Sequence, residues 1–280
     1  MAKIGEKVIV KEKEFAPHMP ECWNPLSKPS KFCPGCGHQI ALKYLGFAID
    51  ELGIQDRTVF GVDIGCSLLA WDFFNIDTIQ THHGRTTPTL IGLKRARPEL
   101  ICIAYMGDGG AYAIGAQHLV SAAMRNDNVL IIVGNNTNYG MTGGQLAPTT
   151  LIGQKTETTP YGRTVEDHGR PLDGCKLVGT LAQEYAFVAR VSSARPLPMK
   201  KVFKSALERQ ISGRGLAFVE VLINCPTNWR TDAKSTLTYM REEIVKTFPT
   251  GVFIDRPDKP DNLYWLKAEE RKEEAEDVEG

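Results

Sequence analysis

Two cysteines three positions apart, Cys33 and Cys36, stand in the stretch FCPGCGHQ at residues 32–39. This spacing is typical of redox dithiols, of zinc knuckles and of loops that ligate iron–sulfur clusters. The chain has seven cysteines in all, and the odd number argues against a framework of disulfides. We therefore expect reduced thiols or metal ligands, and the spacing alone leaves the metal open between zinc and iron.

A second group of polar residues follows two apolar segments in the middle of the chain. The run at 100–106 is followed by Gly107-Asp108-Gly109-Gly110, and the run at 129–133 is followed by Asn135-Asn136. A helical stretch at 113–125 separates the two runs, so the pattern predicts a strand–helix–strand unit of a parallel sheet. The carboxyl ends of neighbouring parallel strands share one edge, where such sheets bind ligands.

Carboxylate and amide oxygens at this edge indicate a magnesium site. Asp108 offers an anionic oxygen and Asn136 a neutral one, and both suit a hard divalent cation. The glycines let a phosphate group approach backbone N–H groups and the N-terminus of the next helix. The pattern favours a diphosphate held through a divalent metal over two plain polar turns. A dinucleotide site is disfavoured, because the third glycine of G-x-G-x-x-G would fall at Tyr112.

The remaining segments predict an α/β fold with a doubly wound, mostly parallel sheet. Further strands are expected at 58–62, 186–191 and 216–223, and helices at 40–52 and 200–211. Residues 140–175 are rich in glycine, threonine and proline, which predicts a long functional loop. We expect three parts, namely an extended N-terminal arm at 1–30, a ligand-binding domain at 31–228 and a C-terminal extension with a charged tail at 229–280.

Composition and charge argue against several classes of partner. Lys and Arg together number 33, as do Asp and Glu, so no net charge favours nucleic acid or a membrane surface. No run reaches the ~18 apolar residues that a membrane span requires. The first residues, MAKIGEKVIVKEKEF, lack the apolar core of a signal peptide. We expect a cytoplasmic protein with neither a membrane span nor a nucleic-acid partner.

Five motifs occur in order between residues 22 and 228, namely CPGCGH, GVDIGCS, HHGR, GDGG and NNTNYGMTGGQ. GDG followed by NN at this distance looks like the thiamine diphosphate fingerprint. The whole set resembles the β subunit of 2-oxoacid:ferredoxin oxidoreductases. The resemblance implies that the domain at 31–228 binds thiamine diphosphate, Mg²⁺ and one [4Fe–4S] cluster. It also implies an α subunit, ferredoxin, a 2-oxoacid and coenzyme A as partners.

The resemblance assigns roles to individual residues. It implies that the cluster is ligated by Cys33, Cys36, Cys66 and Cys225. It implies that Mg²⁺ is held by Asp108, Asn136 and the backbone carbonyl of Asn138. The residues that match cofactor contacts are Ile64, Gly65, Cys66, Ser67, His83, Gly109, Gly110, Gly140 and Met141. No glutamate matches the one that activates the cofactor, so the resemblance implies that the α subunit supplies it and that this chain is inactive alone.

The implied reaction is the oxidative decarboxylation of a 2-oxoacid with coenzyme A to acyl-CoA, CO₂ and reduced ferredoxin. Relatives that act on 2-oxoglutarate tend to have a basic residue three positions after the GCS cysteine, where this chain has Leu69. A second carboxylate without a partner is costly to bury, so we favour 2-oxoisovalerate or another branched-chain acid. Arg85 is the alternative partner for a distal carboxylate, which keeps 2-oxoglutarate open, as pyruvate remains. The competing classes are a non-redox thiamine diphosphate decarboxylase or synthase and a zinc-stabilised binding protein.

Overall fold

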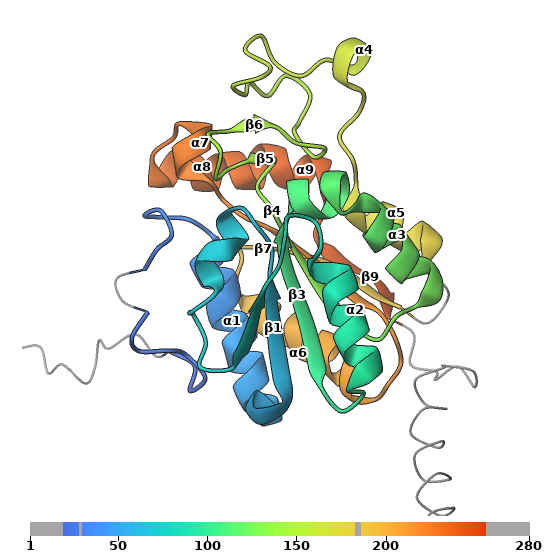
Figure 1. The fold of residues 1–280 in the computed structure, drawn as a ribbon. Helices are drawn as coiled ribbons and strands as arrows, with labels where there is room; N and C mark the ends of the chain where they lie inside the picture. The colour runs from blue at the N-terminus through green and yellow to red at the C-terminus, as the bar shows by residue number, and fades with distance from the viewer. Residues whose placement is uncertain (1–18, 28–29, 183–185, 256–280) are drawn as a thin grey trace, which may run out of the picture.

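The computed structural model describes residues 19–27, 30–182 and 186–255. Its main element is a seven-stranded sheet with the strand order β2-β1-β3-β4-β8-β7-β9 (Figure 1). Neighbouring strands run parallel except for β7 and β9. The strands of the sheet are β1 (Thr58–Val62), β2 (Asp77–Gln80), β3 (Ile101–Gly107), β4 (Leu130–Asn135), β7 (Phe187–Ser192), β8 (Ala217–Leu222) and β9 (Gly251–Asp255). A separate hairpin pairs β5 (Asn138–Tyr139) with β6 (Gln145–Leu146).

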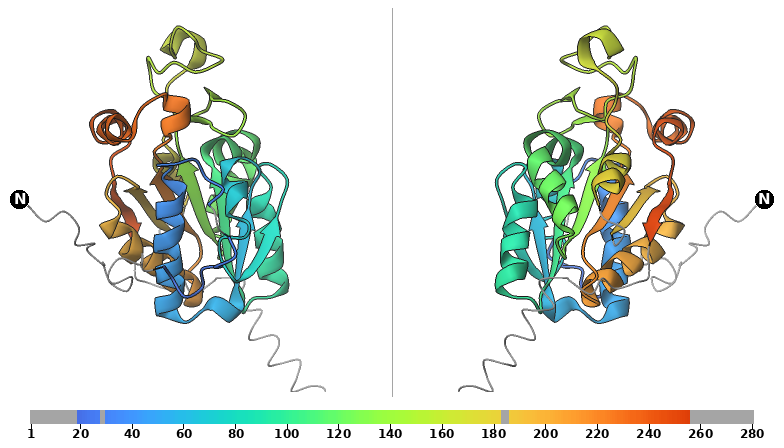
Figure 2. Two further views of the ribbon diagram at one scale, coloured as in Figure 1. Left: turned by 90° about the vertical axis from the view of Figure 1, so that its left-hand side faces the viewer. Right: turned by 90° about the vertical axis from the view of Figure 1, so that its right-hand side faces the viewer.

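Helices cover both faces of the sheet, as the side views of Figure 2 show. One face carries α1 (His38–Leu52) and α6 (Leu197–Ile211), and the other carries α2 (Thr86–Ala96), α3 (Ala116–Arg125) and α5 (Gly174–Leu181). Successive strand residues enter different cores, because side chains alternate between the two faces of a strand. The predicted α/β class with a doubly wound, mostly parallel sheet is confirmed.

The central strands were identifiable in the sequence because they are buried on both faces. All residues of β4 and β8 are buried, and strands covered on both sides form continuous apolar runs. The observed helix α1 begins two residues before the predicted stretch and ends with Gly53 in a left-handed conformation (φ 60°). The helix predicted at 200–211 is α6, which begins earlier, at Leu197.

The segment predicted as a helix at 113–125 differs at its start. A single π-helical turn, η3 (Gly110–Ile114), precedes α3, and the N–H of Gly115 donates to the carbonyl of Gly110 at 2.8 Å. A β carbon on Gly115 would lie 2.8 Å from the carbonyl oxygen of Gly84. The turn is therefore shaped by close backbone contact with the HHGR loop, which local periodicity does not predict.

Residues 229–255, which follow the predicted ligand-binding domain, pack against the sheet. The short helices here are α7 (Pro226–Trp229), α8 (Ala233–Tyr239), η4 (Met240–Ile244) and α9 (Val245–Thr247). Met240, Ile244 and Phe248 form a small core with Leu222 of β8, and β9 extends the sheet beside β7. The charged tail beyond residue 255 and residues 1–18 of the expected arm lie outside the described residues.

The glycine- and threonine-rich segment contains a long excursion above the sheet, with α4 (Val165–His168) at its tip (Figure 1). The guanidinium of Arg163 is buried at its base and donates to six backbone carbonyls. These belong to Ala147, Pro148, Thr150, His168, Gly169 and Arg170. A single cation therefore organises both ends of the excursion.

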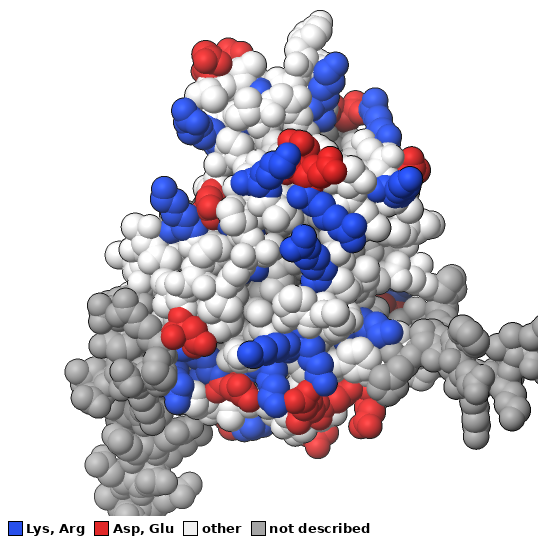
Figure 3. Space-filling model, turned by 180° about the vertical axis from the view of Figure 1, so that it is seen from behind, with Lys and Arg blue, Asp and Glu red and all other residues white. Residues whose placement is uncertain are grey.

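Charged side chains of both signs lie beside each other over much of the rear face (Figure 3). Among the ion pairs of the protein surface, Glu51 of α1 contacts Lys200 and Lys204 of α6. Within the described ranges, no helix combines the length and the apolar character that crossing a membrane requires.

Candidate cofactor and metal site

The carboxyl ends of β1, β3, β4 and β8 bring four loops to one edge of the sheet. The strand registers align Val62 with Tyr105, Gly107 with Gly134 and Asn135 with Leu222. The loops that follow these strands begin with Asp63, Asp108, Asn136 and Ile223, respectively. The two central loops therefore lie where the predicted strand–helix–strand unit requires them.

Asp108 is a buried carboxylate with neutral hydrogen-bond partners. Its Oδ1 accepts from the N–H of Gly109 at 2.9 Å, and its Oδ2 accepts from the hydroxyl of Thr149. Desolvation raises the pKa of Asp108 to about 7, against the effect of these two donors. Among the described residues it forms no ion pair. A buried carboxylate without a countercharge fits a divalent cation, which would stabilise its charged form.

The turn at 135–138 is fixed by hydrogen bonds from distant segments. Thr137 has a positive φ of 60°, which is strained for a β-branched residue. Its carbonyl accepts from the hydroxyl of Thr150 at 2.6 Å, and the carbonyl of Asn136 accepts from the indole N–H of Trp229 at 3.0 Å. The amide N–H of Asn138 donates to the side chain of Asn136 at 3.3 Å. These contacts hold the amide of Asn136 at the edge that Asp108 also occupies.

The glycines of the GDGG loop are required by two neighbouring side chains. A β carbon on Gly109 would overlap with the ring of Tyr139, and one on Gly110 would overlap with Oδ2 of Asp63. The sequence suggested that these glycines allow a phosphate to approach. The structure adds that the loop itself closes against Tyr139 and Asp63, so a larger residue would displace the edge of the site.

Four cysteines gather beside this edge. The loop of Cys33 and Cys36 is joined to the segment before Cys225, because the side chain of Asn224 donates to the carbonyl of Gly35. Burial raises the pKa of Cys36 and Cys66 to about 12. The pKa of Cys36 is raised further by negative charge on the other three thiols, which places all four near one another.

The four thiols are not arranged in the coordination geometry of a bound metal ion. Among the described residues, no three His, Cys, Asp or Glu side chains are arranged to hold a metal ion. Buried thiols that raise each other's pKa are nevertheless the donors that a soft metal or an iron–sulfur cluster stabilises as thiolates. The donor set therefore fits either zinc or a cluster.

Gly140 lies between the thiol of Cys66 and the side-chain amide of Asn136. A β carbon on Gly140 would lie 3.1 Å from Sγ of Cys66 and 3.0 Å from Nδ2 of Asn136. Met141, the next residue, is 45% exposed. The cysteine group and the Asp108–Asn136 edge are thus separated by about the width of one backbone segment.

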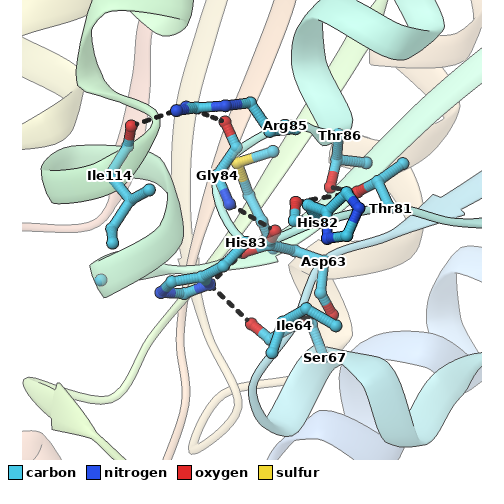
Figure 4. A network of polar contacts seen from close by, with 12 residues as sticks. Asp63, Ile64, Ser67, Thr81, His82, His83, Gly84, Arg85, Thr86 and Ile114 are labelled. Carbon is cyan, nitrogen blue, oxygen red and sulfur yellow. Dashed lines mark hydrogen bonds and ion pairs between the residues drawn. The ribbon is translucent and has the colours of Figure 1, made fainter.

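The loop after β1 carries the other predicted contacts and one residue that was missed. Ile64 is partly exposed, Gly65 has a φ of 116°, and the buried hydroxyl of Ser67 donates to the carbonyl of Asp63 at 3.2 Å. Asp63 is fully buried and also contacts His83 (Figure 4). Its sequence signal is the one that identified Asp108, namely an acidic residue directly after a buried strand.

Three cysteines lie apart from the group. Cys22 is buried, and its thiol donates to the carbonyl of Gly46 at 3.6 Å. Cys102 is buried in β3, as a packing residue should be. Cys175, the last residue of the segment predicted as a loop at 140–175, lies in α5 and donates to the carbonyl of Ala189 at 3.5 Å.

A cavity of the described residues lies elsewhere. It has a volume of about 1270 Å³ and lies between the segment 143–160 and residues 228–243. None of the predicted cofactor or metal residues lines it. Donor chemistry, rather than cavity size, therefore identifies the site.

Comparison with known proteins identifies the family of the chain. Residues 63–221 match the family model of the thiamine pyrophosphate enzyme C-terminal TPP binding domain, so the chain belongs to this family. The 2-oxoglutarate synthase subunit KorB of Archaeoglobus fulgidus is 36% identical over 251 residues, which are 90% of this chain and 89% of KorB. Within the family, the chain is a subunit of the 2-oxoacid:ferredoxin oxidoreductase type, as its motifs predicted.

Two further similar proteins are a ketoisovalerate oxidoreductase subunit and a solved 2-oxoglutarate:ferredoxin oxidoreductase. The ketoisovalerate oxidoreductase subunit VorA of Methanothermobacter thermautotrophicus is 44% identical over 228 residues, 80% of this chain. The chain spans 48% of the length of that VorA. The 2-oxoglutarate:ferredoxin oxidoreductase from Magnetococcus marinus, solved with 2-oxoglutarate, coenzyme A and succinyl-CoA bound, superimposes with a TM-score of 0.74 at 26% identity. The match covers 92% of this chain and 91% of that one.

Proposed function

We propose that this chain is the subunit of a ferredoxin-dependent 2-oxoacid oxidoreductase that binds thiamine diphosphate, Mg²⁺ and a [4Fe–4S] cluster. The assembled enzyme would convert a branched-chain 2-oxoacid and coenzyme A to acyl-CoA and CO₂ and reduce ferredoxin. The observation that carries the proposal is the position of Gly140, against both Sγ of Cys66 and the amide of Asn136. Soft thiol ligands and hard oxygen ligands one backbone segment apart suit electron transfer from a cofactor to a cluster.

In this proposal the residues of the chain hold and shield the cofactor. Bound thiamine diphosphate supplies a carbanion for attack on the keto carbon and an electron sink for the electron pair left when CO₂ departs. Asp108, Asn136 and the carbonyl of Asn138 would hold Mg²⁺, which neutralises the diphosphate. Cys33, Cys36, Cys66 and Cys225 would hold the cluster as thiolates. We place the protein in the cytoplasm, where such thiols remain reduced.

A partner subunit is needed for the activating glutamate. Glu220 is the buried glutamate close enough to Asp108 to raise its pKa. Its carboxylate is already bound by Arg190, the hydroxyl of Tyr112 and the amide of Asn135. A carboxylate held in this way is not free to protonate or deprotonate a cofactor ring. This supports a glutamate from the α subunit, without which the chain is inactive.

Anaerobic metal and cofactor analysis of the complex purified with its partner subunit tests the proposal. We expect about four irons and about four acid-labile sulfides for each copy of this chain, with stoichiometric thiamine diphosphate. Zinc without iron would contradict the cluster, and thiamine diphosphate without iron would indicate a non-redox decarboxylase or synthase instead.

Leu69 supports a branched-chain substrate. It packs against the apolar core beside Cys66 in η2 (Cys66–Ala70). An apolar side chain at this position would offer no partner to the second carboxylate of 2-oxoglutarate, whose unpaired burial would be costly. The identity to VorA, 44%, is also higher than the 36% to the KorB of A. fulgidus.

Steady-state kinetics of the assembled complex test the substrate. We expect a higher kcat/KM for 2-oxoisovalerate than for 2-oxoglutarate or pyruvate, with Leu69→Arg shifting the preference toward 2-oxoglutarate. Leu197→Arg adds the same charge at a position of α6 that is 83% exposed, and as a control it should leave the preference unchanged. A wild-type preference for 2-oxoglutarate would refute the choice and implicate Arg85.

A further inference from the structure

We propose that Asp63 is a positioning residue that fixes His83 as the Nδ1–H tautomer and so presents Nε2, as an acceptor, to a hydroxyl or amino group of the bound ligand. The identity of the ligand rests on the proposed function. The tautomer of His83 is inferred from the structure alone. Figure 4 shows the two side chains facing each other across the loops that follow β1 and β2.

The hydrogen position follows from the two neighbours of Nδ1. This nitrogen lies 3.1 Å from Oδ2 of Asp63 and 3.0 Å from the backbone carbonyl of Ile64. A carbonyl oxygen can only accept a hydrogen bond, and an ionised carboxylate likewise only accepts. With two acceptors against it, Nδ1 must carry the hydrogen, and in the neutral ring Nε2 then has the lone pair.

Asp63 is itself held in one orientation. Its Oδ1 accepts from the backbone N–H of Gly84 at 2.7 Å, so only Oδ2 remains for the histidine. Gly84 has a φ of 70°, and a β carbon there would lie 2.6 Å from the backbone N of Gly115. A larger residue at position 84 would therefore clash with the backbone of Gly115. Arg85 restricts the loop further by donating to the carbonyl of Ile114 at 3.0 Å.

The free nitrogen lies where a ligand would reach it. Within the described residues, no hydrogen bond is made by Nε2 of His83, and the side chain is 29% exposed. The ring borders the GDGG loop, since its Cε1 lies 3.4 Å from the β-carbon position of Gly110. It also meets the ring of Tyr139 with centroids 6.2 Å apart.

This arrangement refines the expectation that His83 contacts the cofactor. A lone pair on Nε2 repels phosphate oxygens, which are acceptors only, so the neutral ring is unsuited to the diphosphate. It suits instead an O–H or N–H donor at the reacting end of the ligand. A carboxylate behind a histidine is a recognised way to fix the tautomer that a reaction needs.

Asp63→Asn changes the tautomer while keeping the size of the side chain. The N–H of Gly84 can only donate, so the amide oxygen should stay on it and the NH₂ group should face Nδ1. That group donates a hydrogen bond, which favours the Nε2–H tautomer and removes the free acceptor. Asp77→Asn, which makes the same charge change at the exposed start of β2, is the matched control.

Nitrogen-15 NMR of the histidine-labelled full chain without cofactor, at about pH 8.5 where histidine is usually neutral, reads the tautomer directly. The chain has six histidines, and the signal of His83 is assigned by its loss in His83→Gln. We expect Nδ1–H in the wild type and in Asp77→Asn, and Nε2–H or a mixture in Asp63→Asn. Nε2–H in the wild type would overturn the proposal, even if Asp63→Asn did not fold.

Kinetics of the assembled complex supply the second readout. We expect Asp63→Asn to lower kcat by about 100-fold or more while KM changes little, as for a triad histidine given the wrong tautomer. His83→Gln should cause a similar loss, and the double variant should be no worse than either single one. An unchanged kcat in Asp63→Asn would refute the role in turnover. A complex lacking thiamine diphosphate would refute the proposed function but not the tautomer.

Discussion

Gly110 packs directly against the buried carboxylate of Asp63, and a β carbon on Gly110 would overlap with Oδ2 of that carboxylate. Gly110 belongs to the loop after β3, and Asp63 directly follows β1. One glycine therefore joins the loop expected to bind diphosphate to the carboxylate that orients His83.

Gly110→Ala should displace Asp63 and destabilise the chain by about 1–3 kcal/mol, the usual cost of adding a methyl group to a closely packed site. Urea unfolding measures the change, and the thiamine diphosphate content of the complex should fall with it. Gly92→Ala in α2 is the control, because nothing lies within 4 Å of the added carbon. That variant should be stabilised by roughly 0.5–1 kcal/mol, and equal behaviour of the two variants would contradict the packing argument.

Asp108→Asn should separate folding from metal binding. The amide oxygen can still accept from Gly109, and the hydroxyl of Thr149 can rotate to accept from the new NH₂ group. The fold should therefore persist, and its stability without cofactor should be unchanged or higher, since a buried charge is removed. The affinity for Mg²⁺ with thiamine diphosphate should fall by about 10–100-fold or more. Cofactor content after gel filtration measures this, and full retention would remove Asp108 from the ligand set.

Cys225→Ser should lower the iron content to well below the ~four irons of a complete cluster. Serine replaces a soft thiolate with a hydroxyl that ligates iron poorly. Cys102→Val, inside β3 and away from the other thiols, should keep the iron of the wild type. Unchanged iron in Cys225→Ser would remove that cysteine from the cluster.

Cys102 should also weaken the chain at alkaline pH. Burial raises its pKa from 9.0 to about 11, although nearby Lys94 acts in the opposite direction. A group whose pKa is raised on folding contributes its full stability below the unfolded value and loses it as the pH rises through the folded value. The stability from this thiol is therefore present below pH 9 and disappears between pH 9 and about 11.

Cys102→Val should flatten this part of the pH profile. Comparing urea unfolding at about pH 8 and about pH 10.5, we expect the wild type to lose on the order of 2 kcal/mol more than the variant. Valine suits a buried strand and has no proton to lose. Parallel losses in both proteins would assign the alkaline sensitivity to other thiols or tyrosines.

Sequence patterns located the strands that are buried on both faces and missed the elements at the sheet's edges. β2 has four residues and none of them is buried, so it lacks an apolar run. α2 carries Pro88 and Gly92 within its eleven residues, which obscures its helical period. β9 joins the sheet only by pairing with β7, a contact that its own five residues do not encode.

The site was predictable where a polar residue follows an apolar strand, and less so where distant loops meet. Asp108 and Asn136 were identified by that rule, which applies equally to Asp63. Thr149 was not identifiable, because it reaches Asp108 from a loop 41 residues away that has no periodicity. The approach of Gly140 to Cys66 likewise arises from tertiary packing.

The six carbonyls bound by Arg163 have a thermodynamic consequence for the excursion they organise. Its conformational entropy is lost during folding, so a molecule that later contacts it need not provide that free energy again. Lysine would not reproduce this, since an ammonium group has three donors on one point whereas the guanidinium distributes five over a plane. The shape of about two dozen residues above the carboxyl edge of the sheet thus depends on the planar guanidinium of Arg163.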